Sequence, residues 1–275
     1  MPELPEVETT RRGLAALVEG ERIDKVIVRN PNLRWPVDLP DGIAGQTIER
    51  ISRRAKYLIF ELQRGCLIVH LGMSGNLRVV PVGAAYRKHD HVAWRLASGS
   101  ELRLHDPRRF GSVHWHSAEP LTHWLLADLG VEPLANEFNG AYLKAQAAKR
   151  RAPVKNFIMD ARVVVGVGNI YANEALFLAG IRPSLRVNRL PLIAWDRLAH
   201  AIREVLLEAI RLGGTTLRDF VKQDGNPGYF TQSLNVYGRQ GEPCRRCATP
   251  LTGCRIGQRA TTYCRSCQRT RGFGA

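Results

Sequence analysis

Two cysteine pairs near the carboxyl terminus constrain the fold of this chain more than any other feature of its sequence. They are spaced as Cys244-x2-Cys247, then sixteen residues, then Cys264-x2-Cys267. Structural zinc prefers four ligands in a tetrahedron, and each CxxC turn supplies two thiolates. The spacing therefore predicts a four-cysteine zinc finger over residues 238–275. A module of this size buries too little apolar surface to fold alone, so the metal would supply most of its folding free energy.

Two other uses of paired cysteines fit the sequence less well. Disulfides belong to exported proteins, and the acidic start of the chain lacks the basic segment of a signal peptide. A redox CxxC lies next to a βαβ unit, whereas these pairs lie among Gly, Thr and Arg. We interpret the remaining cysteines, Cys66 and Cys254, as non-ligands. Residues 238–275 also carry eight arginines against one acid, Glu242, which is typical of a surface that contacts phosphate.

In the rest of the chain, the sequence pattern changes from strand-like to helical near Pro120. Apolar residues recur at helical spacing within residues 3–18, and Gly20 ends the pattern. Short β-branched and aromatic runs follow at 22–29, 46–52, 56–62, 66–71, 76–80, 90–96, 101–105 and 110–116. Runs this short and regular predict a β-sandwich or barrel.

The second half of the chain is predicted to be helical. Helical patterns occupy 120–128, 140–150, 153–160, 169–179 and 191–212. Residues 133–140 are rich in helix breakers and lie between two of these patterns, so we expect the hinge there.

A strong excess of positive charge runs through the 275-residue chain, with a formal net charge of +15. This charge favours a polyanionic partner, most simply nucleic acid, over a small neutral substrate. A membrane surface is the weaker alternative, because the basic residues recur in separate segments, such as Arg108-Arg109 and Lys149-Arg150-Arg151, rather than along one amphipathic helix. No stretch approaches the about 18–20 apolar residues of a membrane span. We expect a globular, cytoplasmic protein.

The chain begins MPELPE, and removal of Met1 would leave the amine of Pro2 beside the carboxylate of Glu3. An α-amino group has a pKa of about 8 against about 10.4 for lysine, so more of it is an unprotonated nucleophile near neutral pH. A secondary amine that attacks a sugar carbon gives an iminium, which is a lasting electron sink. Glu6 lies one helical turn from Glu3, so both carboxylates can face one site and hold one proton between them. The structural alternatives are that Pro2 starts a helix and that Glu6 complements a helix dipole.

Six motifs in order give the chain a likeness to a known family over nearly its full length. They are PELPEVETTRRGL at 2–14, RRAKYLIFEL at 53–62, HLGMSG at 70–75, DPRRFG at 106–111, VVGVGNIYANEAL at 164–176 and DGNPGYF at 224–230. With the cysteine pairs, they make the sequence strongly resemble bacterial formamidopyrimidine-DNA glycosylase.

The resemblance implies an α+β multidomain fold. It has an N-terminal β-sandwich with a flanking N-terminal helix, a helical helix-two-turns-helix domain, and a C-terminal zinc-finger β-hairpin, with DNA held between the halves. The expected domains are a catalytic sandwich at 1–130, a hinge and linker helix at 131–151, the helix-two-turns-helix domain at 152–237 and the zinc finger at 238–275.

The resemblance also implies a bifunctional base-excision repair enzyme that acts on double-stranded DNA. Such an enzyme removes oxidised purines, chiefly 8-oxoguanine and formamidopyrimidines, and cleaves the abasic strand by β,δ-elimination. Pro2 would attack C1′ of the damaged nucleotide, Glu3 would protonate the ring oxygen, Glu6 would assist, and Lys56 would reach a phosphate beside the lesion. One structural Zn²⁺ would occupy the four cysteines. From the residues alone, Lys56 could equally be a solvent-facing strand lysine.

Nine further residues match DNA contacts of the family. They are His70, Met73, His89, Arg108, Phe110, Lys155, Asn169, Tyr237 and Arg259. Base extrusion leaves a hole in the duplex, and the side chains that match its fillers are Met73, Arg108 and Phe110. Hydrophobicity alone would place Met73 and Phe110 in the core.

Two loops complete the expected interface. Gly166, Gly168 and Asn169 form a turn into a helix, where backbone N–H groups can hold an anion, although a GxGN pattern alone is a weak signal. Residues 223–230 have the composition of a loop that closes over an extruded base, and a plain surface loop explains that composition almost as well.

Three other functions compete with this interpretation. The endonuclease VIII branch shares Pro2, Glu3 and the finger but prefers oxidised pyrimidines; Leu4 and the DPRRF segment favour the purine branch. A non-catalytic damage-binding protein would not need Pro2, Glu3 and Lys56. A zinc-ribbon RNA-binding factor would explain the charge and cysteines but not the amino terminus. We expect a monomer with no obligate protein partner.

Overall fold

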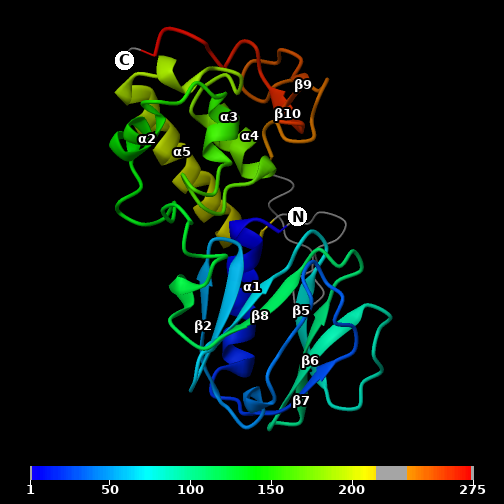
Figure 1. Ribbon diagram of the computed structural model, residues 1–275. Helices are drawn as coiled ribbons and strands as arrows, with labels where there is room; N and C mark the ends of the chain where they lie inside the picture. Colours follow the sequence, from blue (N-terminus) through cyan, green and yellow to red (C-terminus); the bar gives the residue numbers. More distant parts are fainter. Residues whose placement is uncertain (1, 215–233, 274–275) are drawn as a thin grey trace. The chain divides into compact units, whose positions relative to one another are not determined.

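The computed structural model describes residues 2–214 and 234–273. The chain divides into two compact units, each described here by itself (Figure 1). Unit 1 comprises Met1–Asp128 and Leu212–Thr231, and unit 2 comprises Leu129–Arg211 and Gln232–Ala275.

Unit 1 begins with a helix and continues as strands. Its elements are α1 (Leu4–Val18), β1 (Ile23–Val28), β2 (Ile48–Arg54), β3 (Tyr57–Leu62), β4 (Cys66–His70), β5 (Asn76–Pro81), β6 (Asp90–Leu96), β7 (Ser100–His105) and β8 (Ser112–His116), with short 3-10 turns η1 (Asp41–Ile43) and η2 (Pro120–Thr122). Helix α1 starts with proline in its first turn, where a missing N–H costs nothing. It ends at Val18, and the Gly20 that follows has a φ of +82°, a conformation that favours glycine.

Two antiparallel sheets make the predicted sandwich. Their strand orders are β1-β6-β7-β5 and β2-β3-β4-β8. Alternate residues of both sheets and the apolar face of α1 meet in one core, which includes Leu14, Phe60, Val69, Trp94 and Leu102. The sandwich is therefore confirmed, and α1 is fixed to it by this core.

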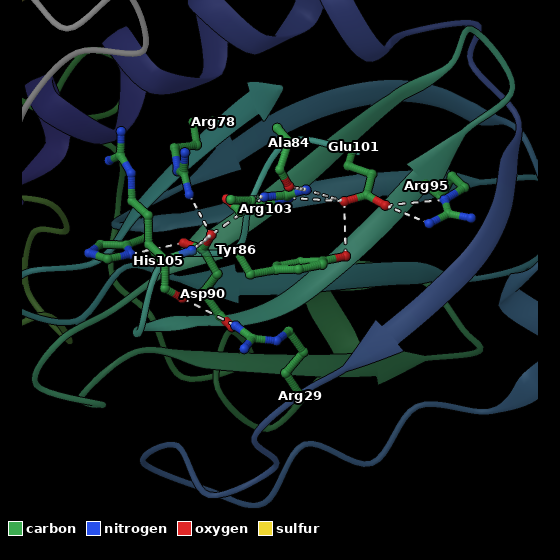
Figure 2. Close-up of polar contacts among 11 residues, drawn as sticks. Arg29, Arg78, Ala84, Tyr86, Asp90, Arg95, Glu101, Arg103 and His105 are labelled. Atoms are coloured by element: carbon green, nitrogen blue, oxygen red, sulfur yellow. Dashed lines mark hydrogen bonds and ion pairs between the residues drawn. The ribbon is translucent and has the colours of Figure 1, made fainter. Parts of the chain in front are cut away.

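A buried network of charged residues on β5, β6 and β7 contacts the segment of residues 84–87 (Figure 2). Arg103 donates to the Glu101 carboxylate at 2.7 Å and to the carbonyl of Ala84 at 2.8 Å. The hydroxyl of Tyr86 donates to Glu101 at 2.9 Å, and its ring lies 3.8 Å from the Arg103 guanidinium carbon. These contacts fix the chain just before His89.

Asp90 is the second carboxylate of this network. It accepts hydrogen bonds from Arg78 and, at 2.9 Å, from the Arg87 backbone N–H, and it contacts His105 Nδ1 at 2.9 Å. Burial would raise the pKa of Asp90, but these hydrogen bonds outweigh it and lower the pKa overall. Glu101 behaves in the same way. Both groups therefore stabilise the fold above their unfolded pKa, and that contribution is lost as the pH falls through the folded value.

Replacement of Arg103 by methionine is expected to destabilise unit 1 strongly. It would leave Glu101 buried with part of its charge uncompensated, which typically costs about 3–5 kcal/mol. Thermal unfolding followed by circular dichroism measures the effect. Arg22→Met is the control, because the Arg22–Asp24 pair is exposed and its loss should leave the midpoint unchanged. Equal midpoints for the two variants would show that the buried network does not stabilise the fold.

The helix predicted at 120–128 is wrong. The chain there forms η2 and then turns, because His123 has extended backbone angles (φ −65°, ψ 137°) that end the 3-10 helix. Leu121 and Trp124 are exposed and only Leu126 is buried among the core residues there, so no apolar face is available to pack a longer helix.

Unit 2 contains four α-helices and a hairpin among its described residues. They are α2 (Gly140–Ala147), α3 (Val154–Ile158), α4 (Asn169–Leu178), α5 (Leu192–Arg211), β9 (Thr252–Ile256) and β10 (Arg259–Tyr263), with a 3-10 turn η3 (Val187–Arg189). Helices α2 and α4 pack against α5, whose buried residues include Trp195, Leu198 and Ile202 on one face. In the part of the chain that is described, none of the helices is long and apolar enough to cross a bilayer.

Candidate functional site

The amino terminus is held by its own first helical turn. Pro2, Glu3 and Glu6 are all buried. The backbone N–H of Glu3 donates to Glu6 Oε2 at 2.8 Å, and the Glu3 carbonyl accepts the Val7 N–H as the helix begins. Glu6 therefore fixes the backbone that carries Pro2 and Glu3. This capping contact is a structural role for Glu6 other than the helix-dipole role considered above, and it places the Glu6 carboxylate next to Glu3.

Lys56 lies in the tight turn between β2 and β3 and is half-buried. The pKa of His70 is lowered to about 4, mainly by burial and further by the positive charges of Lys56 and Arg34. His70 is therefore neutral near pH 7. The N–H of Gly72 donates to His70 Nδ1 at 3.0 Å, which leaves the ring proton on Nε2, where it can donate to a phosphate.

The loops that carry Met73 and Arg108 pack directly on each other. Gly72 has a φ of +66°, and a Cβ added there would lie 2.4 Å from the backbone nitrogen of Gly111. Met73 is half-buried, whereas the ring of Phe110 is 43% exposed. The guanidinium carbon of Arg108 lies 5.1 Å from that ring. Phe110 is thus a surface side chain rather than a core residue, as a wedge requires.

Arg108 and Phe110 also line a surface hollow of about 480 Å³. The other lining residues are Asn32, Leu33, Arg34 and Arg109. Three of its six lining residues are arginines, so this hollow attracts anions.

One buried carboxylate, Asp106, holds together the two loops that carry Met73 and Arg108. Its Oδ1 accepts the Ser74 hydroxyl at 2.9 Å and the Arg108 N–H at 3.3 Å, and its Oδ2 accepts the Gly111 N–H at 2.8 Å. Ser74 follows Met73 directly. The positions of Met73 and Arg108 are therefore set by the same side chain.

Replacement of Asp106 by alanine is expected to loosen both loops. Each donor left unsatisfied in a buried place costs about 1–3 kcal/mol. We expect a lower unfolding midpoint and weaker binding of a duplex with a tetrahydrofuran abasic analogue. Ser74→Ala removes one donor of the three and should give the smaller loss. An affinity unchanged in Asp106→Ala would show that the loops need no such anchor to bind DNA.

His89 follows the segment that the buried network fixes. It is half-buried, with its ring 6.0 Å from His91 and 5.9 Å from His105. Its carbonyl accepts the Asp106 N–H at 3.0 Å. His89 is thereby connected to Asp106, which holds the loops of Met73 and Arg108.

In unit 2, Asn169 begins helix α4 after the N-cap Gly168. Gly166 has a φ of +79°, so the tight turn predicted here is confirmed. The start of an α-helix is the positive end of the helix dipole, which suits an anion. Asn169 Oδ1 is buried, and no hydrogen bond to it is found among the described residues.

Glu174 of the same helix holds the segment that leads into the finger. Its buried carboxylate accepts the backbone N–H groups of Asn235, Val236 and Tyr237 at 2.8–2.9 Å. Tyr237 is half-buried and is placed by this contact. The predicted lesion-covering loop at 223–230 lies outside the described residues.

The four predicted cysteines form one cluster. Their sulfur atoms lie within 4.8 Å of one another; Cys244 and Cys267 are 3.9 Å apart, and Cys247 and Cys264 are 3.4 Å apart. A tetrahedron with Zn–S bonds of about 2.3 Å has S–S edges of about 3.8 Å, so the cluster fits a metal ion and is far too open for a disulfide.

The other two cysteines lie elsewhere. Cys254 is exposed on β9, and Cys66 is buried in β4 of unit 1. Neither belongs to the cluster, in agreement with the interpretation of both as non-ligands.

Lys155 lies in the interior of unit 2. It is fully buried on α3, and its ammonium donates to the Ala260 carbonyl at 2.8 Å and to Thr261 Oγ1 at 2.7 Å. These contacts hold strand β10, and the DNA contact expected for Lys155 stays a prediction. Arg259 is exposed and follows the Gly257-Gln258 turn between β9 and β10, where it is available for contact.

Sequence reasoning missed the carboxylates that position this site. Asp106 opens the DPRRFG motif and Glu174 lies inside VVGVGNIYANEAL, but the sequence does not show that either carboxylate accepts several backbone N–H groups. Glu8 lies in PELPEVE and forms ion pairs with Arg11, Arg12 and Arg53. The available signal was the presence of each acid inside one of the six motifs.

Three features occur together in this chain: a proline beside two buried carboxylates, a strong positive charge, and a β-hairpin next to a cluster of four cysteines. Together they place the protein in the class of DNA-repair glycosylases. Two family models match the chain. The formamidopyrimidine-DNA glycosylase N-terminal domain matches residues 1–113, and the formamidopyrimidine-DNA glycosylase H2TH domain matches residues 129–221.

Similar proteins agree with these matches. The formamidopyrimidine-DNA glycosylases of Alkalilimnicola ehrlichii and Marinobacter nauticus are 58% and 55% identical over 98% of this chain and 100% of theirs. The crystal structure of the MutM (Fpg) protein of Thermus thermophilus superposes with a TM-score of 0.88 at 39% identity, covering 97% of this chain and 98% of that one. Lactococcus lactis Fpg in complex with DNA that contains an abasic site gives 0.89 at 34% identity, covering 97% and 99%. The chain belongs to the formamidopyrimidine-DNA glycosylase family.

Proposed function

We propose that this protein removes oxidised purines, chiefly 8-oxoguanine and formamidopyrimidines, from duplex DNA and then cleaves the abasic strand. The observation that carries the proposal is the first helical turn, where the Glu6 carboxylate fixes the backbone of Glu3 beside Pro2. Relatives with 53–58% identity bear the glycosylase name, and a related enzyme has been crystallised with DNA that contains an abasic site.

The chemistry follows from a secondary amine beside a proton donor. Pro2 nitrogen forms a bond to C1′ as the bond to the base breaks, and Glu3 gives a proton to the ring oxygen as the sugar opens to an iminium. The iminium acidifies the C2′ proton, so its loss expels the 3′ phosphate, and a second elimination expels the 5′ phosphate. Hydrolysis then returns the free amine.

The remaining residues bind and shape the DNA in this proposal. Lys56 and His70 contact backbone phosphate near the lesion, and Met73, Arg108 and Phe110 fill the space left by the extruded base. His89 in unit 1 and Asn169, Tyr237 and Arg259 in unit 2 contact the DNA backbone. Cys244, Cys247, Cys264 and Cys267 hold one structural Zn²⁺, which would supply folding free energy to the finger and no chemistry to the reaction.

We propose a cytoplasmic enzyme that acts on DNA as a monomer, because one chain supplies every residue that the reaction uses. Borohydride trapping tests the activity. The protein is incubated with an 8-oxoguanine:cytosine duplex and borohydride, and the adduct is mapped by mass spectrometry. An adduct on Pro2 in a chain without Met1 is expected. Neither adduct nor cleavage would overturn the enzymatic function in favour of damage binding, and trapping only with an oxidised-pyrimidine duplex would move the chain to the endonuclease VIII branch.

A further inference from the structure

Lys56 occupies a strained turn. Strands β2 and β3 pair from Arg54 to Tyr57, which leaves only Ala55 and Lys56 in the hairpin loop. Ala55 has a φ of +55° and is buried. Tight hairpin turns with a positive φ at this position prefer glycine, because a Cβ there lies too close to the backbone. Strain of this kind persists only where the surrounding structure holds it.

Arg53 holds the turn from the strand before it. Its Nη1 donates to the carbonyl oxygen of Ala55 at 2.9 Å. That carbonyl belongs to the peptide bond that joins Ala55 to Lys56. The Arg53 guanidinium therefore fixes the backbone of the residue immediately before Lys56.

The same guanidinium reaches the helix that carries the amine. Arg53 Nε donates to Glu8 Oε2 at 3.2 Å, and the side chains of Arg53 and Glu8 are only 11% and 12% exposed. Burial would raise the pKa of Glu8, but hydrogen bonds from Arg11 and Arg12 outweigh it and lower the pKa to about 2. Glu8 is therefore ionised throughout the neutral range. Glu8 lies on α1, the helix that begins directly after Pro2 and its N-cap residue Glu3.

We infer that Glu8 and Arg53 are positioning residues that fix the position of the Lys56 ammonium group relative to the Pro2 amine. The ion pair joins helix α1 to the strained turn, so the two parts of the site move as one. The inference rests on the proposed function, because it acts through the role of Lys56 at the substrate phosphate. An ion pair that only stabilised the fold would not couple to Lys56.

Arg53→Gln tests the inference against a matched control. Arg12 also donates to Glu8, at 2.8 Å, but its side chain is 59% exposed, and among the described residues it makes no hydrogen bond to the turn. The readout is the single-turnover rate of borohydride trapping on a preformed abasic duplex at saturating protein. A misplaced catalytic group costs about 10- to 100-fold in rate. We expect that loss in Arg53→Gln and a change below about twofold in Arg12→Gln.

A double-mutant cycle separates positioning from general destabilisation. If Arg53 acts through Lys56, the variant with both Arg53→Gln and Lys56→Ala should trap at the rate of Lys56→Ala alone. Losses that multiply would overturn the inference. Should Arg53→Gln fail to fold, Glu8→Gln tests the other end of the ion pair, and its slowing must likewise vanish in the Lys56→Ala background.

The outcomes distinguish this inference from the proposed function. A wild-type chain that traps no adduct overturns both. Normal trapping by the wild type, with equal rates for Arg53→Gln and Arg12→Gln, overturns the positioning role alone and leaves the activity in place.

Discussion

Replacement of Glu3 by glutamine is expected to abolish release of 8-oxoguanine while sparing cleavage at a preformed abasic site. Base release needs a proton at the sugar ring oxygen, and a positioned general acid contributes about 10²–10⁴-fold to such a step. Glutamine has nearly the same shape and leaves the backbone N–H that donates to Glu6 in place, but it has no proton to give. An abasic sugar has already lost its base, so it needs only the amine of Pro2.

Two duplexes measure this split in single-turnover experiments. One contains 8-oxoguanine opposite cytosine, and the other contains a preformed abasic site. We expect Glu3→Gln to lose activity only on the first. Glu6→Gln is the control, because its amide oxygen can still accept the Glu3 N–H, and it should give a smaller loss shared by both duplexes. Equal losses of Glu3→Gln on the two substrates would contradict a proton-donor role and indicate a general disturbance of the first turn.

Most elements of unit 1 could be predicted from sequence, because their side chains meet one shared core. Strands such as β3 and β4 show β-branched and aromatic runs of the right length, and both bury these residues. In the region 120–128 the same periodicity argument predicts a helix that the structure does not contain. Its apolar residues have helical spacing, but the backbone of His123 is extended and Trp124 faces solvent, so tertiary context overrides local periodicity.

The sequence predicts which residues belong to the candidate site, but it does not predict which of them are buried. An exposed Phe110 and a buried Lys155 are the reverse of what hydrophobicity suggests, because each is decided by the loop or strand that it contacts. Lys155 can be buried only because a carbonyl and a hydroxyl of β10 accept its protons. Sequence periodicity carries no information about such long-range partners. The same limit hid Asp106, whose partners include Ser74 in the distant loop between β4 and β5.

Residues 133–140 lie in unit 2, which begins at Leu129. The guanidinium of Arg203 on α5 binds the carbonyls of Pro133, Ala135 and Phe138, a set of long-range contacts that composition does not reveal. The helix breakers lie in a loop that α5 holds, and the hinge expected at 133–140 stays a prediction.

Loss of one clustered cysteine is expected to unfold the finger and strip its metal. Cys264 is buried with Cys244 among Phe177, Val236 and Leu251, a cluster too small to order the finger without help. A structural zinc ion contributes about 10–16 kcal/mol of apparent folding free energy in isolated fingers. In Cys264→Ser we therefore expect zinc content to fall from one ion per chain to none and affinity for the abasic-analogue duplex to fall steeply.

Cys254→Ser is the matched control for this experiment. Cys254 lies on the same hairpin, is exposed, and is outside the sulfur cluster, so its loss should leave metal content and affinity unchanged. Elemental analysis of the purified protein and a titration with labelled duplex give both readouts. Lys155 on α3 and Asn173 on α4 contact β10, whereas α2 and α4 pack on α5, so these helices can stay folded while the finger opens. A finger that keeps its zinc in Cys264→Ser, or a wild-type chain that holds no metal, would contradict a four-thiolate site. If both variants lost affinity equally, the hairpin surface itself, and not the metal, would control DNA binding.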